Sequence, residues 1–126
     1  MADKIKLRVV TPSRLMLDEE VDEVPNHISF LSTLVPGEMS YKQGASKRIL
    51  AVSGGYAEVL DNVMTVLAPA AEFGAEIDTV RAQRAKERAE KQMAELNREE
   101  KDFELAEVAL QRALVRLEVA SKDARR

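Results

Sequence analysis

Hydrophobic and polar residues alternate strictly over residues 4–10, where Ile5, Leu7 and Val9 fall on one face and basic residues on the other. A period of two predicts a half-buried β-strand. Short apolar stretches continue to residue 67, and turn-forming residues separate them at intervals of about 8–12 residues, as in small all-β domains. The turns are predicted at 11–13, 35–38, 43–46, 54–55 and 61–62. We therefore expect residues 1–70 to form a meander that closes on itself as a small antiparallel β-sandwich or barrel.

The hydrophobic period changes from Ile77 onward. Asp78 is a good helix N-cap, and after it small and apolar residues recur every three or four positions. The segment 97–101 interrupts this pattern, and Asp102 can cap a second helix. The two predicted stripes are Ala82, Ala85, Ala89, Met93 and Leu96 in the first helix, and Ala106, Leu110, Ala113, Leu117 and Ala120, with Leu114 alongside, in the second. We expect an antiparallel helical hairpin that is held weakly, because an alanine seam buries little apolar area.

Glycine and proline divide the chain at the same place. All five glycines and all four prolines precede residue 75, whereas residues 78–126 contain neither and are rich in charged side chains. Turn-formers in one part and their absence from the other predict strands followed by helices. We therefore expect the α+β class, with an N-terminal antiparallel β-sandwich or barrel at 1–77 and a C-terminal two-helix antiparallel hairpin at 78–126.

Composition and charge narrow the range of functions. Of the 126 residues only 4% are aromatic, and the net charge is -3, which argues against nucleic-acid binding by base stacking or by a basic surface. There is no cysteine, which excludes disulfides, thiolate metal sites and cysteine nucleophiles. No apolar run is long enough to span a membrane, and the N-terminus lacks a secretory apolar region, so we expect a soluble, cytosolic chain.

The sequence offers little for catalysis. It contains none of the common phosphate-loop, dinucleotide, zinc-protease or hydrolase motifs. His27 is the single histidine, and because it follows Pro25 and Asn26 it is expected in a surface turn rather than in a catalytic pair. The acidic residues at 18–20 and 22–23 are interpreted as a solvated cluster at a strand end rather than as a cation site.

Asp78, Arg81 and Arg88 form a charged group with a possible chemical use. The spacing of seven places the two arginines on one helix face near the helix start. Two guanidiniums close to a helix N-terminus can hold a polyphosphate through bidentate contacts and the helix dipole. The alternative is that Asp78 only caps the helix and the arginines pair with neighbouring glutamates on its surface. Spacing alone favours this second interpretation, because charged helix faces are usually solvated.

Several blocks of sequence resemble a known family. In chain order they are LRVVTPSRLMLDEEVDEV, PNHISFLSTLVPGEMSYKQG, LAVSGGYAEVLDNVMTVLAPAAE, IDTVRA and ALVRLEVA. They are similar to the epsilon subunits of bacterial or organellar F-type ATP synthases and span nearly the whole chain. The resemblance implies a β-sandwich at the foot of the central stalk, against the gamma subunit and the c-ring, followed by a mobile helical hairpin. It also implies a non-catalytic subunit that couples proton-driven rotation to ATP synthesis, peripheral to the cell membrane on its cytoplasmic side and attached only through the complex.

Two sets of functional residues follow. In the family the hairpin can extend into the catalytic head and inhibit ATP hydrolysis, and our hypothesis is that basic residues of the second helix then meet acidic loops of the alpha and beta subunits. These residues are Arg112, Arg116 and Lys122, with Arg125 and Arg126 after them. In some members the folded hairpin binds regulatory ATP. The positions that match this motif are Glu72, Ile77, Asp78, Arg81, Ala82 and Arg88. No metal and no other cofactor is expected.

The chain departs from the family between Val24 and Pro25. There the family normally carries about a dozen further residues, a Gly-rich loop and strand that faces the c-ring, close to the length of a strand plus a turn. A true deletion would put the c-ring contact and a sheet edge in doubt. The other explanation, which we expect, is that the sequence omits a segment of the protein. A free-standing ATP-sensing binding module is the alternative function, and a small enzyme has no supporting group of residues.

Overall fold

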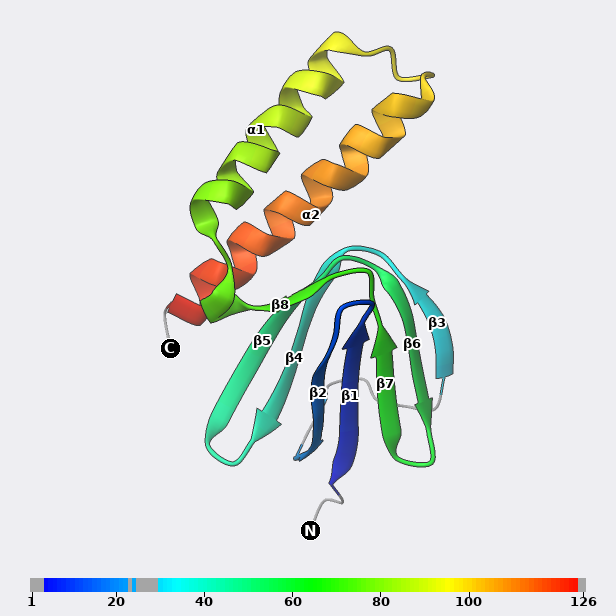
Figure 1. Ribbon diagram of the computed structural model, residues 1–126, viewed down its shortest axis with the longest axis vertical. Coiled ribbons are helices and arrows are strands. Elements are labelled where there is room, and N and C mark those ends of the chain that lie inside the picture. Colours follow the sequence, from blue (N-terminus) through cyan, green and yellow to red (C-terminus); the bar gives the residue numbers. More distant parts are fainter. Residues whose placement is uncertain (1–3, 23, 25–29, 125–126) are drawn as a thin grey trace.

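The computed structural model describes residues 4–22, 24 and 30–124 of the 126-residue chain. The predicted fold class is confirmed, since a β-sandwich is followed by a two-helix hairpin that stands at one end of it (Figure 1). A short 3-10 helix η1 (Gly74–Glu76) leads from the last strand to the helices α1 (Thr79–Glu95) and α2 (Lys101–Ala124). The strands are β1 (Ile5–Thr11), β2 (Arg14–Val21), β3 (Phe30–Leu34), β4 (Gly37–Gln43), β5 (Ser46–Val52), β6 (Gly55–Leu60), β7 (Val63–Leu67) and β8 (Ala71–Phe73).

Two sheets make up the sandwich, with the orders β2-β1-β7-β6-β3 and β4-β5-β8. Neighbouring strands pair antiparallel except β1 and β7, which run parallel with Leu7 opposite Met64. The expectation of a simple meander is therefore wrong. The chain leaves the first sheet after β3 to build β4 and β5, and later inserts β7 between β1 and β6. Alternation of apolar residues sets which face of a strand is buried but does not set its neighbour, so the sequence pattern could not predict this order.

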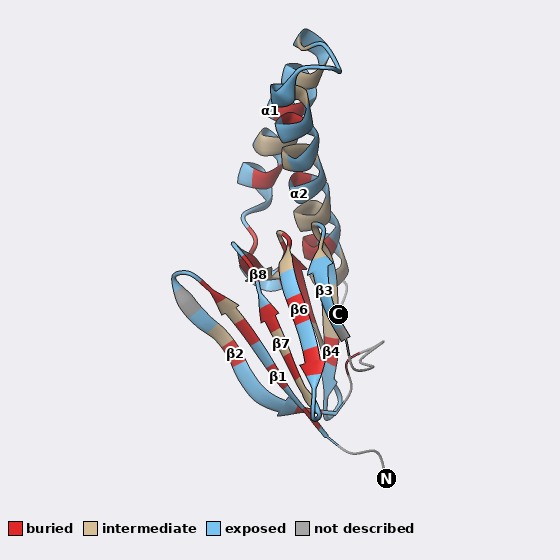
Figure 2. Ribbon diagram, turned by 90° about the vertical axis from the view of Figure 1, so that its right-hand side faces the viewer, coloured by how far each residue is buried: buried red, intermediate tan, exposed pale blue. Residues whose placement is uncertain are grey.

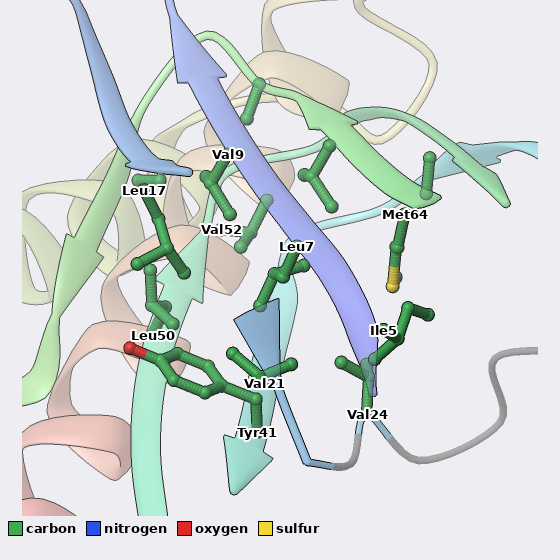
Figure 3. Close-up of a cluster of buried hydrophobic side chains, with 14 of the residues drawn as sticks. Ile5, Leu7, Val9, Leu17, Val21, Val24, Tyr41, Leu50, Val52 and Met64 are labelled. Atoms are coloured by element: carbon green, nitrogen blue, oxygen red, sulfur yellow. The ribbon is translucent and has the colours of Figure 1, made fainter. Parts of the chain in front are cut away.

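The sandwich has a core of its own. The predicted alternation in β1 is confirmed, because Ile5, Leu7 and Val9 are at most 1% exposed. Figure 3 shows them with side chains from the facing strands, including Tyr41 and Leu50. Among the described residues, the cluster includes none from the hairpin. The described part of this core is therefore formed by the sandwich alone.

The predicted turn between β6 and β7 is also confirmed. Asp61 and Asn62 have φ angles of 50° and 61°, the left-handed conformation that two-residue hairpin turns require. Aspartate and asparagine adopt it more easily than other non-glycine residues, because their side chains can hydrogen-bond locally. The side chain of Asn62 donates to the backbone carbonyl of Lys4, which ties this turn to the start of β1.

The helical hairpin is built on small side chains. Ala82 and Ala89 from α1 and Ala106 and Ala113 from α2 are buried in the predicted seam, whereas the predicted flanking residue Leu114 is 45% exposed. Figure 2 shows that most of the hairpin surface far from the sandwich is exposed. Neither helix in the described part of the chain is long and apolar enough to cross a membrane.

The start of α2 differs from the prediction. The helix begins at Lys101, so the expectation that Asp102 caps it is wrong, and this aspartate lies within the first turn. A carboxylate in the first turn still interacts favourably with the positive end of the helix dipole. In the sequence, an aspartate that caps a helix cannot be told from one in the first turn. The predicted helix start is therefore wrong by only a few positions.

Strand β5 is covered on both faces. Leu50 and Val52 belong to the sandwich core, whereas Ile49 and Ala51 lie in a second buried cluster with Val119 of α2. The end of α2 thus docks on the outer face of the three-stranded sheet. This second cluster is much smaller than the sandwich core, so the contact between the two parts rests on few apolar side chains.

Gly74 allows α2 to approach η1 closely. A Cβ at this position would lie 2.6 Å from Cβ of Asp123 and 3.0 Å from the carbonyl oxygen of Val119. Real Cβ atoms do not tolerate the shorter distance, and its partner belongs to the docked helix. The compact arrangement therefore requires glycine here for space.

Candidate functional site

A cavity of about 440 Å³ lies between the sandwich and the hairpin. This volume is in the range of small-molecule sites, about 300–1,000 Å³. Small side chains line most of it, and its charged groups come from β8, α1 and α2. The lining residues are Ala51, Val52, Ser53, Ala70, Glu72, Arg81, Ala85, Ala109, Arg112, Ala113, Val115 and Arg116. Both parts of the chain contribute, so the cavity exists only while the hairpin is docked.

The charges around the cavity are unbalanced. Nε of Arg116 donates to Oε1 of Glu72 at 2.7 Å, and Nη2 of Arg116 donates to Oε2 at 3.2 Å, a bidentate pair that is partly buried. Arg81 and Arg112 also line the cavity, and within the described residues neither has an ion-pair partner. The described lining of the cavity therefore contains three guanidiniums and one carboxylate. Such an arrangement favours an anionic ligand, and planar guanidiniums suit phosphate oxygens in particular.

The residues of the predicted ATP motif do not all meet at the cavity. Glu72 and Arg81 line it. Ile77 and Ala82 are buried, at 8% and 0% exposure, and are not among the residues that line the cavity. Asp78 is the N-cap of α1, since its Oδ1 accepts from the backbone N–H of Arg81 at 3.0 Å. The capping interpretation of Asp78 is thus confirmed, and this bond fixes the start of the helix that carries Arg81.

Arg88 is the motif residue farthest from the cavity. It is exposed and lies seven positions beyond Arg81 on α1. It follows Arg81 and Ala85 along one helix face, but it is not part of the cavity lining. Among the described residues, neither Arg81 nor Arg88 forms an ion pair with a neighbouring glutamate. The surface pairing considered from the sequence is therefore not what the structure contains.

The basic residues predicted to contact the catalytic subunits lie on the docked side of α2. Arg112 and Arg116 line the cavity, and Nζ of Lys122 donates to both carboxylate oxygens of Glu38 at 2.8 Å. The hydrogen bonds that Lys122 donates to Glu38, and a second contact to Glu118, raise the pKa of Lys122 above its ordinary value. The sequence analysis assigned Arg112 and Arg116 to contacts with the catalytic subunits and did not predict that they line the cavity. Only the folded hairpin brings them to the same cavity as Arg81.

The acidic cluster near the end of β2 has a structural explanation. Asp18 lies 3.4 Å from Nζ of Lys6 and 3.6 Å from Nε of Arg8, across the β1–β2 ladder. Oδ2 of Asp22 accepts from the backbone N–H of Gly44 at 2.6 Å. Over the described ranges, no group of acidic and histidine side chains could hold a metal ion. His27 lies outside the described residues.

Replacing Asp78 with alanine is expected to destabilise the start of α1 by about 1 kcal/mol, because the N-cap bond to Arg81 is lost. Asp78→Asn keeps a capping oxygen and should destabilise the helix start by only a few tenths of a kcal/mol. Hydrogen exchange of the amides of residues 79–82 measures the difference. Protection that is equal in the alanine variant and the unmodified chain would contradict the capping role.

Comparisons with known proteins agree over the whole chain. Residues 4–74 match the family model described as ATP synthase, Delta/Epsilon chain, beta-sandwich domain, and residues 75–121 match its long alpha-helix domain. The ATP synthase epsilon chain of Syntrophobacter fumaroxidans is 48% identical, over 97% of this chain and 99% of its own length. The ATP synthase epsilon chain of Geobacter sulfurreducens is 43% identical, with both chains fully covered.

A solved structure shares the fold. A chain of the cryo-EM structure of the Euglena gracilis mitochondrial ATP synthase, described as OSCP/F1/c-ring in rotational state 1, superposes with a TM-score of 0.73. The match covers 98% of this chain and 82% of that chain, at 22% identity. Identity at this level supports the fold alone. The predicted sandwich followed by helices is thus seen again in an independent molecule.

The same comparisons confirm a difference in length. The alignment with the Geobacter sulfurreducens chain runs over 138 positions and covers the whole of this 126-residue chain, so at least 12 of those positions have no residue here. This number equals the dozen residues expected between Val24 and Pro25. The full-length matches and the two consecutive domain matches nevertheless leave no part of the chain unassigned. The protein therefore belongs to the ATP synthase delta/epsilon chain family and is a non-catalytic subunit of that enzyme.

Proposed function

We propose that the chain is a regulatory rotor subunit in which ATP holds the helical hairpin against the sandwich and thereby relieves inhibition of ATP hydrolysis. The sandwich, residues 1–77, binds the gamma subunit and the c-ring. The hairpin, residues 78–126, leaves the sandwich in the inhibited state and contacts the alpha and beta subunits. The subunit is attached peripherally to the cytoplasmic side of the membrane through this complex and couples proton-driven rotation to ATP synthesis.

The cavity between the two parts carries this proposal. Arg81, Arg112 and Arg116 belong to the hairpin, whereas Glu72 belongs to the sandwich. A ligand that touches both binds the docked form and not the released form. It stabilises docking by RT ln(1 + [ATP]/Kd), about 2.7 kcal/mol at a hundredfold excess over Kd. The excess of guanidinium groups suits the triphosphate.

Over the described residues, the contacts that hold the hairpin on the sandwich include one small apolar cluster around Val119. They also include the ion pairs of Glu72 with Arg116 and of Glu38 with Lys122. The pair of Glu38 with Lys122 is exposed. Exposed ion pairs contribute about 0–1 kcal/mol to stability. A ligand or a partner surface worth a few kcal/mol can therefore decide whether the hairpin is docked.

Release of the hairpin changes what its arginines can bind. Arg112 and Arg116 line the cavity in the docked form, so they serve ATP there and become free for acidic loops of the alpha and beta subunits after release. Lys122 gives up Glu38 in the same movement. One set of cations thus supports two mutually exclusive states, which makes ATP binding and inhibition compete.

Isothermal titration of the full chain with ATP is expected to give saturable heat. Arg112→Ala should weaken binding about tenfold, because it removes a charge-assisted contact worth about 1.5 kcal/mol. Arg84→Ala is the matched control, since Arg84 is an exposed arginine of α1 outside the cavity lining. The absence of heat at millimolar ATP would contradict ATP binding at this cavity. An equal loss of ATP affinity in both variants would contradict it as well.

The alternative, a free-standing ATP-sensing module, predicts the same titration. The two differ in their partners. A rotor subunit co-purifies with gamma, alpha and beta subunits in stoichiometric amounts, whereas a free module elutes alone. Recovery of the chain only as a free protein from cells that contain an assembled ATP synthase would favour the module.

A further inference from the structure

The cavity between the sandwich and the hairpin has two chemically different sides. The side formed by the hairpin carries the guanidiniums of the hairpin arginines, Arg81, Arg112 and Arg116. On the side formed by the sandwich, the described lining contains one charged group, the carboxylate of Glu72, and one hydroxyl, that of Ser53. Guanidiniums attract phosphate, whereas a carboxylate repels it. An anionic group that enters the cavity is therefore drawn toward the hairpin and away from the sandwich.

Small side chains make up most of the uncharged lining. Ala51 and Ala70 come from the sandwich, and Ala85 and Ala109 come from the hairpin. Ligand sites are mostly apolar, with a few polar groups that fix the orientation of the ligand. Methyl groups on both sides leave space for a flat ring and contact its faces by dispersion. The uncharged lining therefore suits a planar heterocycle, and in a nucleotide that group is the base.

Ser53 offers a hydrogen-bond donor in this uncharged lining. Its Oγ accepts from the backbone N–H of Ala70 at 2.9 Å, and its own backbone N–H donates to the carbonyl oxygen of Ala70 at 3.0 Å. A serine hydroxyl can accept and donate at the same time. Within the described part of the chain, no acceptor takes the hydroxyl proton of Ser53. This proton is therefore available to a ligand.

The backbone around Ser53 is fixed in the docked chain. Ser53 directly follows β5 and Ala70 directly precedes β8, so their two hydrogen bonds continue the β5–β8 ladder by one position. At Gly55, where φ is 103°, a Cβ would overlap the carbonyl oxygen of Leu67, so glycine is required for this close approach. A donor that is already held in place costs a ligand less ordering entropy.

We propose that ATP binds in one direction, with its triphosphate on the hairpin arginines and its base on the sandwich, where the hydroxyl of Ser53 donates to a ring nitrogen of adenine. Ring nitrogens of adenine accept hydrogen bonds. This assignment rests on the ATP binding proposed above and adds which part of the chain holds which end of the ligand. Because different parts of the chain hold the two ends, the intact nucleotide joins the hairpin to the sandwich.

Isothermal titration of the full chain with ATP and three analogues tests the contact. In 1-deaza-, 3-deaza- and 7-deaza-ATP, one ring nitrogen of adenine is replaced by carbon. We expect one analogue to bind the unmodified chain about three- to tenfold more weakly than ATP, which is the effect of one neutral hydrogen bond. Ser53→Ala should weaken ATP binding by the same factor. It should not weaken the binding of that analogue any further, because the contact is already absent.

Three variants control for a structural role of Ser53, and a thermal melt checks that each is folded. Ser53→Thr keeps the hydroxyl and should bind ATP within about twofold of the unmodified chain. Ser46→Ala removes an exposed hydroxyl at the other end of β5, outside the cavity lining, and should leave ATP binding unchanged. Arg112→Ala acts at the phosphate end and should weaken the binding of ATP and of all three analogues by equal factors.

The outcomes separate this inference from ATP binding itself. Equal weakening of ATP and all three analogues by Ser53→Ala would show that the serine only supports the fold, and would overturn the inference while ATP binding stands. Three analogues that all bind the unmodified chain as tightly as ATP would overturn it as well. So would ATP binding that Ser53→Ala leaves unchanged. The absence of heat with ATP and the unmodified chain would contradict the proposed function, and this inference with it.

Discussion

Removal of residues 78–126 is expected to abolish ATP binding by the chain and to raise ATP hydrolysis by the assembled complex severalfold. The truncation removes Arg81, Arg112 and Arg116, which supply the positive charge of the cavity. It also removes the segment proposed to enter the catalytic head. Assembly should be unaffected, because the sandwich cluster contains no hairpin residue in the described chain.

The measurement compares complexes that contain the full or the truncated chain, with the subunit composition checked on a gel. The rate of ATP hydrolysis by each complex is measured. Isothermal titration of the isolated chains measures ATP binding. Arg84→Ala in the full chain controls for the loss of helix-surface charge. Unchanged hydrolysis by a fully assembled truncated complex would contradict the inhibitory role of the hairpin.

Gly74→Ala is expected to have the opposite effect on hydrolysis. The added Cβ would lie 2.6 Å from Cβ of Asp123 on α2, so the helix end must move away from η1. Overpacking of this kind costs about 1–3 kcal/mol. The cost falls on the docked form alone, so the ratio of docked to released chains decreases by about five- to 150-fold. The apparent Kd for ATP should rise by up to the same factor, and inhibition of hydrolysis should increase.

Two further variants separate this explanation from general damage to the sandwich. Gly37→Ala is the matched control, because among the described residues a Cβ there meets only the carbonyl oxygen of Val35, at an ordinary 3.7 Å. Asp123→Gly removes the closest atom that the new methyl group meets and should partly restore ATP binding to Gly74→Ala. An unchanged Kd for Gly74→Ala, or a loss that Gly37→Ala reproduces, would show that close approach at Gly74 does not control docking.

Local patterns in the sequence predicted local features of the fold well. Alternation identified β1 and its buried face, the Asp61–Asn62 pair marked a turn, and Asp78 marked the start of α1. Each of these depends on residues close together in the chain. Strand neighbours depend on the competition of whole strands for partners, which is why the parallel pairing of β1 with β7 was not predicted.

The candidate site was predicted only in part for the same reason. Glu72 and Arg81 lie close together in the sequence and could be identified by a motif. Arg112 and Arg116 reach the cavity because α2 folds back along α1, and the Glu72–Arg116 pair joins residues 44 positions apart. The charges along one helix do not predict which face of a second helix will pack against that helix. The signal that could have found them is the alanine seam, because it fixes which side of α2 faces α1.

The double coverage of β5 has a consequence for the chain on its own. When the hairpin leaves, Ile49 and Ala51 of β5 and nearby Ile77 lose their cover from Val119 and become an exposed apolar patch. Such a patch favours self-association. Isolated chains that open should therefore aggregate in a concentration-dependent manner, and ATP should act as a solubilising additive during purification. Storage conditions that favour docking would then determine how long a preparation of the free subunit survives.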